Sequence, residues 1–84
     1  MDPNPKDLQV GARLRARRMG LGMSDEALAD ALGVSLQQVL AWELGVTSIE
    51  ASWLLRVAKV LNVDSWYFFM SSDAPSSQLG GAPV

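Results

Sequence analysis

Apolar side chains recur every three or four positions through most of the chain, which is the spacing of helices that bury one face. This spacing predicts a first helix over about residues 6–19 and further helices over residues 25–32, 36–44 and 49–62. A short aromatic segment over residues 65–70 predicts a fifth helix. No segment has the character of a strand. We therefore expect an all-α fold, a compact domain of five helices.

The middle helices carry clear end signals. Ser24 and Ser35 are favourable N-cap residues, and Gln38 follows Ser35 at the spacing of a capping box. Gly33 and Gly45 supply the left-handed residue at which helices commonly end. These signals put a short turn between the second and third helices and predict a helix-turn-helix.

The fourth helix is expected to begin with a second capping box, formed by Thr47 and Glu50. Together the apolar stripes predict which side chains meet in the core. The predicted core residues are Val10, Leu14, Leu21, Leu28, Ala29, Leu32, Val39, Trp42, Ile49, Leu54, Val57, Ala58 and Leu61.

The helices make one domain, for which we predict residues 6–70. Residues 1–5 include two prolines and are expected to be a flexible N-terminal arm. Residues 71–84 are rich in Ser, Gly and Pro, and we expect them to be a disordered tail. A chain of 84 residues buries only a modest core, so tight helix packing or a partner has to support it.

The composition excludes several kinds of site. The sequence contains no Cys and no His, so disulfides, the ordinary zinc ligands and the commonest general base are absent. No apolar run is long enough to span a bilayer, and the N-terminus lacks the apolar segment of a signal peptide. We expect a cytoplasmic protein that is not an enzyme and that uses no metal, no cofactor and no membrane.

The charges are distributed unevenly around a net charge of −2. Four of the seven basic residues fall close together, at Arg13, Arg15, Arg17 and Arg18. Residues 19–55 contain no Lys or Arg and five acidic residues, a formal charge of −5. Nucleic-acid binders usually present a basic surface, so this distribution is a warning against such a role. The arginines of the first helix are either phosphate contacts or a solvated helix face.

The helix-turn-helix pattern and its flanks resemble the lambda-repressor-like, Cro/XRE family of DNA-binding domains. The matching segments are GARLRARR, GMSDEALADALGVS, VLAWELG and LLRVAKVLNVDSWYFF. They occur in the family's order and spacing and cover about residues 11–69. The resemblance implies a transcriptional repressor that binds a specific operator in double-stranded DNA as a homodimer.

The resemblance also assigns roles to residues. The third helix would enter the major groove, and the second would lie across it with its N-terminus on the phosphate backbone. The positions implied to contact DNA are Ser24, Asp25, Ser35, Leu36, Gln37, Gln38, Leu40, Ala41, Leu44 and Ser48, with Arg17 at the edge of the footprint. Arg18 and Glu43 would form a structural ion pair. Dimer contacts lie toward the C-terminal end of the domain, which makes Trp66 and Phe69 the candidates for them.

The aromatic segment over residues 65–70 is expected to contribute both to the core and to the surface. We expect Tyr67 or Phe68, together with Phe69, to close the core of so small a domain. Trp66 is expected to point outward, where aromatic residues are enriched at protein interfaces. Phe69 is thus a candidate for the core as well as for the dimer contact. Trp53 fits either place.

The chain departs from the family's pattern at DNA-facing positions. Asp25 occupies a position where Gln is usual, so an anion would face phosphate. Ser48 occupies a position where an Arg is common. Apolar residues replace polar or basic ones at Leu36, Leu40, Ala41, Leu44 and Val46.

These departures leave two hypotheses for the third helix. Leu36, Leu40 and Leu44 are spaced four apart and form a stripe on its outer face. If the helix binds DNA, apolar side chains contact thymine methyl groups and Gln37 binds adenine N6 and N7. Alternatively, DNA binding is weakened and the stripe binds another regulatory protein, as an antagonist or an antitoxin-like partner would.

Overall fold

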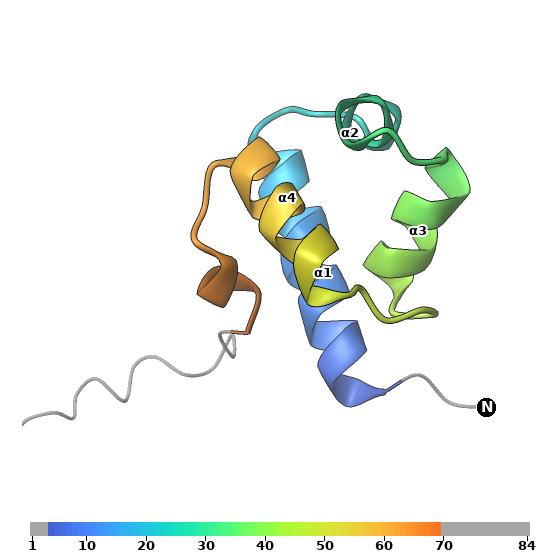
Figure 1. Ribbon diagram of the computed structural model, residues 1–84, viewed down its shortest axis with the longest axis vertical. Helices are drawn as coiled ribbons and strands as arrows, with labels where there is room; N and C mark the ends of the chain where they lie inside the picture. The colour runs from blue at the N-terminus through green and yellow to red at the C-terminus, as the bar shows by residue number, and fades with distance from the viewer. Residues whose placement is uncertain (1–3, 70–84) are drawn as a thin grey trace, which may run out of the picture.

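The structure, a computed structural model, describes residues 4–69 of the chain. This part is built from the helices α1 (Pro5–Gly20), α2 (Asp25–Leu32), α3 (Leu36–Leu44) and α4 (Ala51–Leu61) and the 3-10 helix η1 (Ser65–Phe69) (Figure 1). Every element within the described residues is helical, so the predicted all-α class is confirmed. Four of the five predicted helices are α-helices, and the last predicted segment winds as a short 3-10 helix.

Helix α1 begins one residue earlier than predicted. The side chain of Asn4 accepts a hydrogen bond from the backbone N–H of Lys6 at 2.7 Å and caps the helix. Pro5 occupies the first helical position. Proline has no N–H, but an N–H at this position would have no partner within the helix. The predicted arm therefore ends before Pro5, and residues 1–3 of it lie outside the described residues. The predicted tail, residues 71–84, also lies outside them.

Helices α2 and α3 begin and end as their sequence signals predicted. The hydroxyl groups of Ser24 and Ser35 accept hydrogen bonds from backbone N–H groups three residues later, at 3.0 and 3.1 Å. Gly33 and Gly45 have φ angles of 74° and 73°, in the left-handed region that favours glycine. The tight turn between these caps holds the two helices as a helix-turn-helix.

The predicted capping box of the fourth helix is wrong. Helix α4 begins at Ala51, and its N-cap residue Glu50 makes no side-chain capping bond. Thr47 lies in the loop before the helix, where its hydroxyl oxygen is 3.5 Å from the amide nitrogen of Gln38. The spacing of a capping box was present, but the helix starts too late for Thr47 to cap it.

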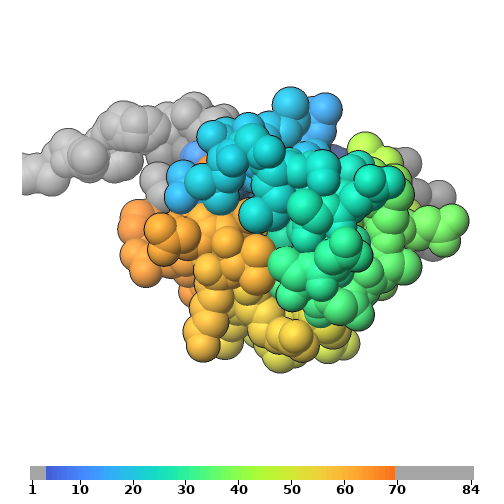
Figure 2. Space-filling model, turned by 90° about the horizontal axis from the view of Figure 1, so that it is seen from above, coloured from blue at the N-terminus to red at the C-terminus, as the bar shows by residue number. Residues whose placement is uncertain are grey.

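The core forms where the apolar faces of the helices converge. Helix α1 packs against α3 and η1, and α2 packs against α3 and α4. Seen from above, α2 lies between α3 and the C-terminal half of α4 (Figure 2). The buried apolar side chains are Val10, Leu14, Leu28, Ala29, Leu32, Val39, Trp42, Leu54, Val57, Ala58, Leu61 and Phe68, with Ile49 and Trp53 partly buried against them.

Two predicted core residues lie at the surface instead. Leu21 is 44% exposed because it caps the C-terminus of α1 and belongs to the turn beyond the helical stripe. Phe69 is 52% exposed, since the 3-10 winding of η1 turns Phe68 rather than Phe69 into the core. The prediction of Phe69 as a core residue is therefore wrong.

A glycine allows the closest approach between two helices. A Cβ atom at Gly11 of α1 would lie 2.3 Å from the carbonyl oxygen of Trp42 and 2.6 Å from that of Glu43. Only a residue without a side chain fits there, so α3 lies directly on α1. Within the described residues, α3 forms one edge of the molecule and η1 the opposite edge (Figure 1). None of these helices is long and apolar enough to cross a membrane.

Candidate nucleic-acid interface

Helix α3 turns one sector of its surface away from the protein. We call this sector the outer face of α3; it consists of Leu36, Gln37, Leu40, Ala41 and Leu44. Leu40 and Leu44 are 37% and 63% exposed, Gln37 is exposed, and the other two are half-buried. The opposite side of the helix carries its buried residues. All five residues were predicted DNA contacts, and the structure brings them together on one side.

The helix-turn-helix has two capped helix N-termini, at Ser24 and Ser35. The backbone N–H groups at the starts of α2 and α3, beside Ser24 and Ser35, carry partial positive charge that favours an anion. Asp25 already supplies an anion at the first position of α2, where its carboxylate accepts a hydrogen bond from the Glu26 backbone N–H at 2.9 Å. Asp25 therefore stabilises the helix start, and it would repel a phosphate placed there.

Arg18 and Glu43 form a buried ion pair behind the outer face. Arg18 Nε donates to Glu43 Oε2 at 2.6 Å, and a second guanidinium nitrogen donates to Oε1 at 3.2 Å. A third guanidinium nitrogen donates to the backbone carbonyl of Met23 at 2.8 Å. The hydrogen bond with Glu43 raises the pKa of Arg18, although burial opposes this. Glu43 is thus turned into the protein, and its charge does not belong to the outer face.

The other arginines of α1 do not act together. Arg17 donates from Nε to the Leu61 carbonyl oxygen at 2.9 Å and from a terminal nitrogen to that of Asn62 at 3.4 Å. Its charge therefore lies at the C-terminus of α4, where the helix dipole favours a cation. The guanidinium carbon of Arg13 lies 5.1 Å from the ring centroid of Tyr67. The prediction of Arg17 as a phosphate contact stays a prediction, and its guanidinium also has this structural role.

Arg15 is an exposed arginine that borders the outer face of α3. It helps to line a hollow of about 540 Å³ between α1 and α3. The residues lining this hollow are Ala12, Arg15, Arg18, Asp25, Leu40, Glu43 and Leu44. Arg15 and Asp25 thus share one edge of the candidate interface with opposite charges.

Two further predicted DNA contacts make hydrogen bonds within the protein. The Ser48 hydroxyl donates to Asp7 Oδ2 at 2.7 Å, which brings a carboxylate of α1 to the loop after α3. Gln38 is half-buried, and its amide nitrogen is directed to Thr47. Asp7 could not be predicted from its neighbours in the sequence, because its partner is 41 positions away. Ser48 and Gln38 are therefore less available to DNA than the residues of the outer face.

The predicted dimer residues lie at the other edge of the molecule. Trp66 is 60% exposed, and its indole N–H donates to Asp64 Oδ2 at 3.2 Å. Phe69 is exposed on the same short helix, η1. These two aromatic side chains remain available for a partner, far along the molecule from α3 (Figure 1).

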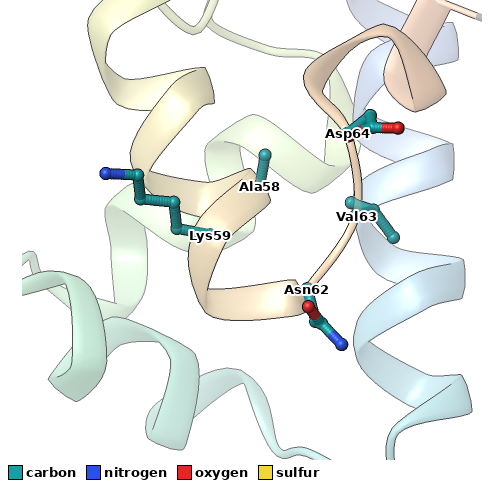
Figure 3. A pocket seen from close by; sticks show the side chains of 5 residues that line it. All are labelled: Ala58, Lys59, Asn62, Val63 and Asp64. Atoms are coloured by element: carbon teal, nitrogen blue, oxygen red, sulfur yellow. The ribbon is translucent and has the colours of Figure 1, made fainter.

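A second hollow, of about 410 Å³, lies at the C-terminal end of α4 (Figure 3). It is lined by Ala58, Lys59, Asn62, Val63 and Asp64. The polar ends of Lys59, Asn62 and Asp64 point in different directions and do not converge (Figure 3). This arrangement offers no common binding point, so the outer face of α3 is the better candidate site.

Comparison with known proteins agrees with this geometry. The model of the helix-turn-helix family matches residues 14–65. An uncharacterized HTH-type transcriptional regulator of Sinorhizobium medicae is 43% identical over 81 residues, which are 96% of this chain and 57% of that protein. The chain thus spans only 57% of the length of this curated relative.

Two solved structures share the fold. The restriction-modification controller protein C.AhdI from Aeromonas hydrophila has a TM-score of 0.74 and 27% identity, covering 79% of this chain and all of that one. The P22 c2 repressor, in complex with a synthetic operator, has a TM-score of 0.67 and 33% identity, covering 71% of this chain and 91% of that one. The chain belongs to the lambda-repressor-like helix-turn-helix family.

Proposed function

We propose that the chain is a sequence-specific, DNA-binding transcriptional regulator that acts as a repressor and inserts the outer face of α3 into the major groove. The observation that carries this proposal is that α3 lies at the edge of the molecule and leaves Gln37, Leu40 and Leu44 exposed on its outer face. The P22 c2 repressor, which shares the fold at 33% identity, supports it because that structure contains an operator. The same leucines would suit a protein partner, but the relatives are named as transcriptional regulators.

Base contacts then come from the outer face, and backbone contacts come from its surroundings. Gln37 supplies the polar side chain, while Leu36, Leu40, Ala41 and Leu44 supply apolar contacts. The N–H groups at the starts of α2 and α3 face phosphates beside Ser24 and Ser35, and the carboxylate of Asp25 weakens the contact at α2. Arg15 adds a cation at the edge. Affinity is modest, because few cations neutralise phosphate.

A homodimer brings two copies of α3 to one operator. The exposed aromatic residues Trp66 and Phe69 of η1 form the interface, since large apolar side chains at a surface commonly mark protein contacts. A two-fold dimer of this kind binds two half-sites about one DNA turn apart. We place this activity in the cytoplasm and expect it to need no catalysis, metal or cofactor.

Direct DNA binding by the full chain tests the proposal. Fluorescence anisotropy with labelled duplexes, selected first from a random-sequence pool, should give saturable binding whose affinity falls steeply with salt. Leu40→Glu puts an anion on the outer face and should abolish binding. Leu55→Glu introduces the same charge at an exposed leucine of α4 and should leave binding intact.

The proposal is contradicted if the unchanged chain binds no duplex at low salt. It is also contradicted if Leu40→Glu and Leu55→Glu bind equally well, because α3 would then not be the DNA-contacting helix. Circular dichroism of both variants checks that their helices are retained, so loss of binding is not loss of folding.

A further inference from the structure

We propose that α3 selects its operator mainly through thymine methyl groups and one adenine contact. The half-site would then be a run of A·T pairs in which no guanine is required. This inference rests on the proposed function, because it specifies the base sequence that the outer face of α3 binds.

The polar capacity of the outer face is limited to one side chain. Gln37 is exposed, and its amide both donates and accepts hydrogen bonds. This pairing matches the N6 amino group and N7 of adenine in the major groove. Gln38 does not add a second such contact, since its amide nitrogen is directed to Thr47 in the protein. One adenine per half-site therefore receives a two-bond contact.

The side chains that most often contact guanine are absent from this face. The commonest contact to guanine O6 and N7 is a pair of donors from Arg or Lys. Residues 19–55, which include all of α2 and α3, contain neither. Arg18 is bound to Glu43 and to a backbone carbonyl. Arg15 belongs to α1 and lies at the edge with Asp25, where the phosphate backbone would run.

The apolar residues of the face suit the methyl group that distinguishes thymine. Leu40, Ala41 and Leu44 lie on one side of α3, and the two leucines are well exposed. An A·T pair presents the thymine C5 methyl group in the major groove, whereas a G·C pair presents polar hydrogen-bonding groups and no methyl group there. A leucine placed on a G·C pair would desolvate these polar groups without replacing their hydrogen bonds. The face thus favours thymine and disfavours a G·C pair.

Replacement of thymine by deoxyuridine isolates the methyl group, because uracil differs from thymine only at C5. We would select the best duplex with the full chain and then replace its thymines one at a time. Where a methyl group meets the outer face, affinity should fall about fourfold, the effect of exposing one buried methylene-sized group.

A double-mutant cycle identifies the protein partner. Leu40→Ala should weaken binding to the thymine duplex severalfold but have little further effect on the duplex that lacks the matching methyl group. Leu55→Ala, at an exposed leucine of α4, should lower affinity for neither duplex. Gln37→Ala should likewise weaken binding to the unmodified duplex. It should have little further effect on a duplex in which one adenine is replaced by 7-deazaadenine, which lacks the N7 acceptor.

The outcomes separate this inference from the proposed function. If the chain binds a duplex whose half-site requires guanine, and deoxyuridine has no effect, thymine recognition is wrong while DNA binding stands. If Leu40→Ala weakens both duplexes equally, Leu40 does not contact the methyl group and the inference fails. If no duplex is bound at all, both the function and the inference fail.

Discussion

Arg18 and Glu43 join the end of α1 to the last turns of α3 through a bond of 2.6 Å between Nε and Oε2. The same guanidinium also donates to Met23 in the turn that leads to α2. One side chain thus fixes three segments of the helix-turn-helix relative to one another. Both partners are buried, at 9% and 7% exposure, so the pair is not a surface contact of small effect.

Glu43→Gln should destabilise the fold strongly. The substitution keeps the shape of the side chain but leaves a buried guanidinium without its counter-charge, a loss of about 3–5 kcal/mol when one partner of such a pair is removed. Urea denaturation followed by circular dichroism measures this. Glu50→Gln, at an exposed residue without a capping bond, is the control and should change stability by less than about 0.5 kcal/mol.

Replacing both partners by apolar residues should restore most of that stability. Arg18→Met with Glu43→Leu removes two charges whose desolvation opposes folding, and buried pairs replaced in this way are often neutral or stabilising. The same denaturation measurement applies. A double variant as unstable as Glu43→Gln would mean that the bond from Arg18 to Met23, rather than the ion pair, holds the turn.

Stability should be almost independent of pH between about 6 and 9. The hydrogen bond with Glu43 raises the pKa of Arg18 above the ordinary arginine value. Such a raised pKa stabilises the folded protein fully at any pH below the pKa of the same group in the unfolded chain. The stabilisation is lost only when the pH rises through the pKa in the folded protein, in strongly alkaline solution. The sequence has no His or Cys that titrates near neutrality. Thermal melts across this range test the expectation, and a midpoint that shifts by several degrees would contradict it.

Gly11→Ala should separate α1 from α3. The new methyl group would meet two backbone carbonyl oxygens, at 2.3 and 2.6 Å, which cannot swing aside as a flexible side chain can. We expect a loss of about 1–3 kcal/mol or more, as for other overpacked sites. Gly20→Ala is the matched control, because nothing lies within 4 Å of its Cβ position and its backbone φ is not positive. It should be neutral or stabilise by up to about 1 kcal/mol.

Features that depend on neighbouring residues could be predicted from the sequence, whereas those that depend on distant ones could not. The ends of α2, at Ser24 and Gly33, could be predicted because capping depends on a few neighbouring residues. The bond from Arg17 to the Leu61 carbonyl could not be predicted, because the two residues are 44 positions apart and leave no local pattern in the sequence. Phe69 was misplaced because helical spacing does not distinguish an α-helix from the tighter 3-10 winding of η1.

Arg15 and Arg17 should differ in their effects on DNA binding and on stability. Arg15→Ala removes the exposed cation at the edge of the outer face, so the slope of log affinity against log salt should fall by about one. Arg17→Ala removes bonds to two carbonyl oxygens at the end of α4 and should cost about 1–2 kcal/mol of stability. Salt titrations and urea denaturation of both variants test this. Equal changes in salt slope would show that Arg17 contacts phosphate as Arg15 does.

Asp25→Asn should strengthen DNA binding. The carboxylate lies at the start of α2 and in the hollow beside Leu40, where the phosphate backbone would pass. Removing one repulsive charge within a few ångströms of phosphate should raise affinity about three- to tenfold at low salt, and less at high salt. The helix start would lose a favourable anion at a cost of about 0.3–1 kcal/mol.

Asp30→Asn makes the same change of charge at an exposed position near the other end of α2 and is the matched control. Anisotropy titrations of both variants at two salt concentrations separate local repulsion from the overall change in net charge. If both substitutions raise affinity equally, the net charge of the chain limits binding. If Asp25→Asn instead weakens binding, the carboxylate of Asp25 helps DNA binding by stabilising the N-terminus of α2. This stabilisation would then outweigh the repulsion between the carboxylate and phosphate.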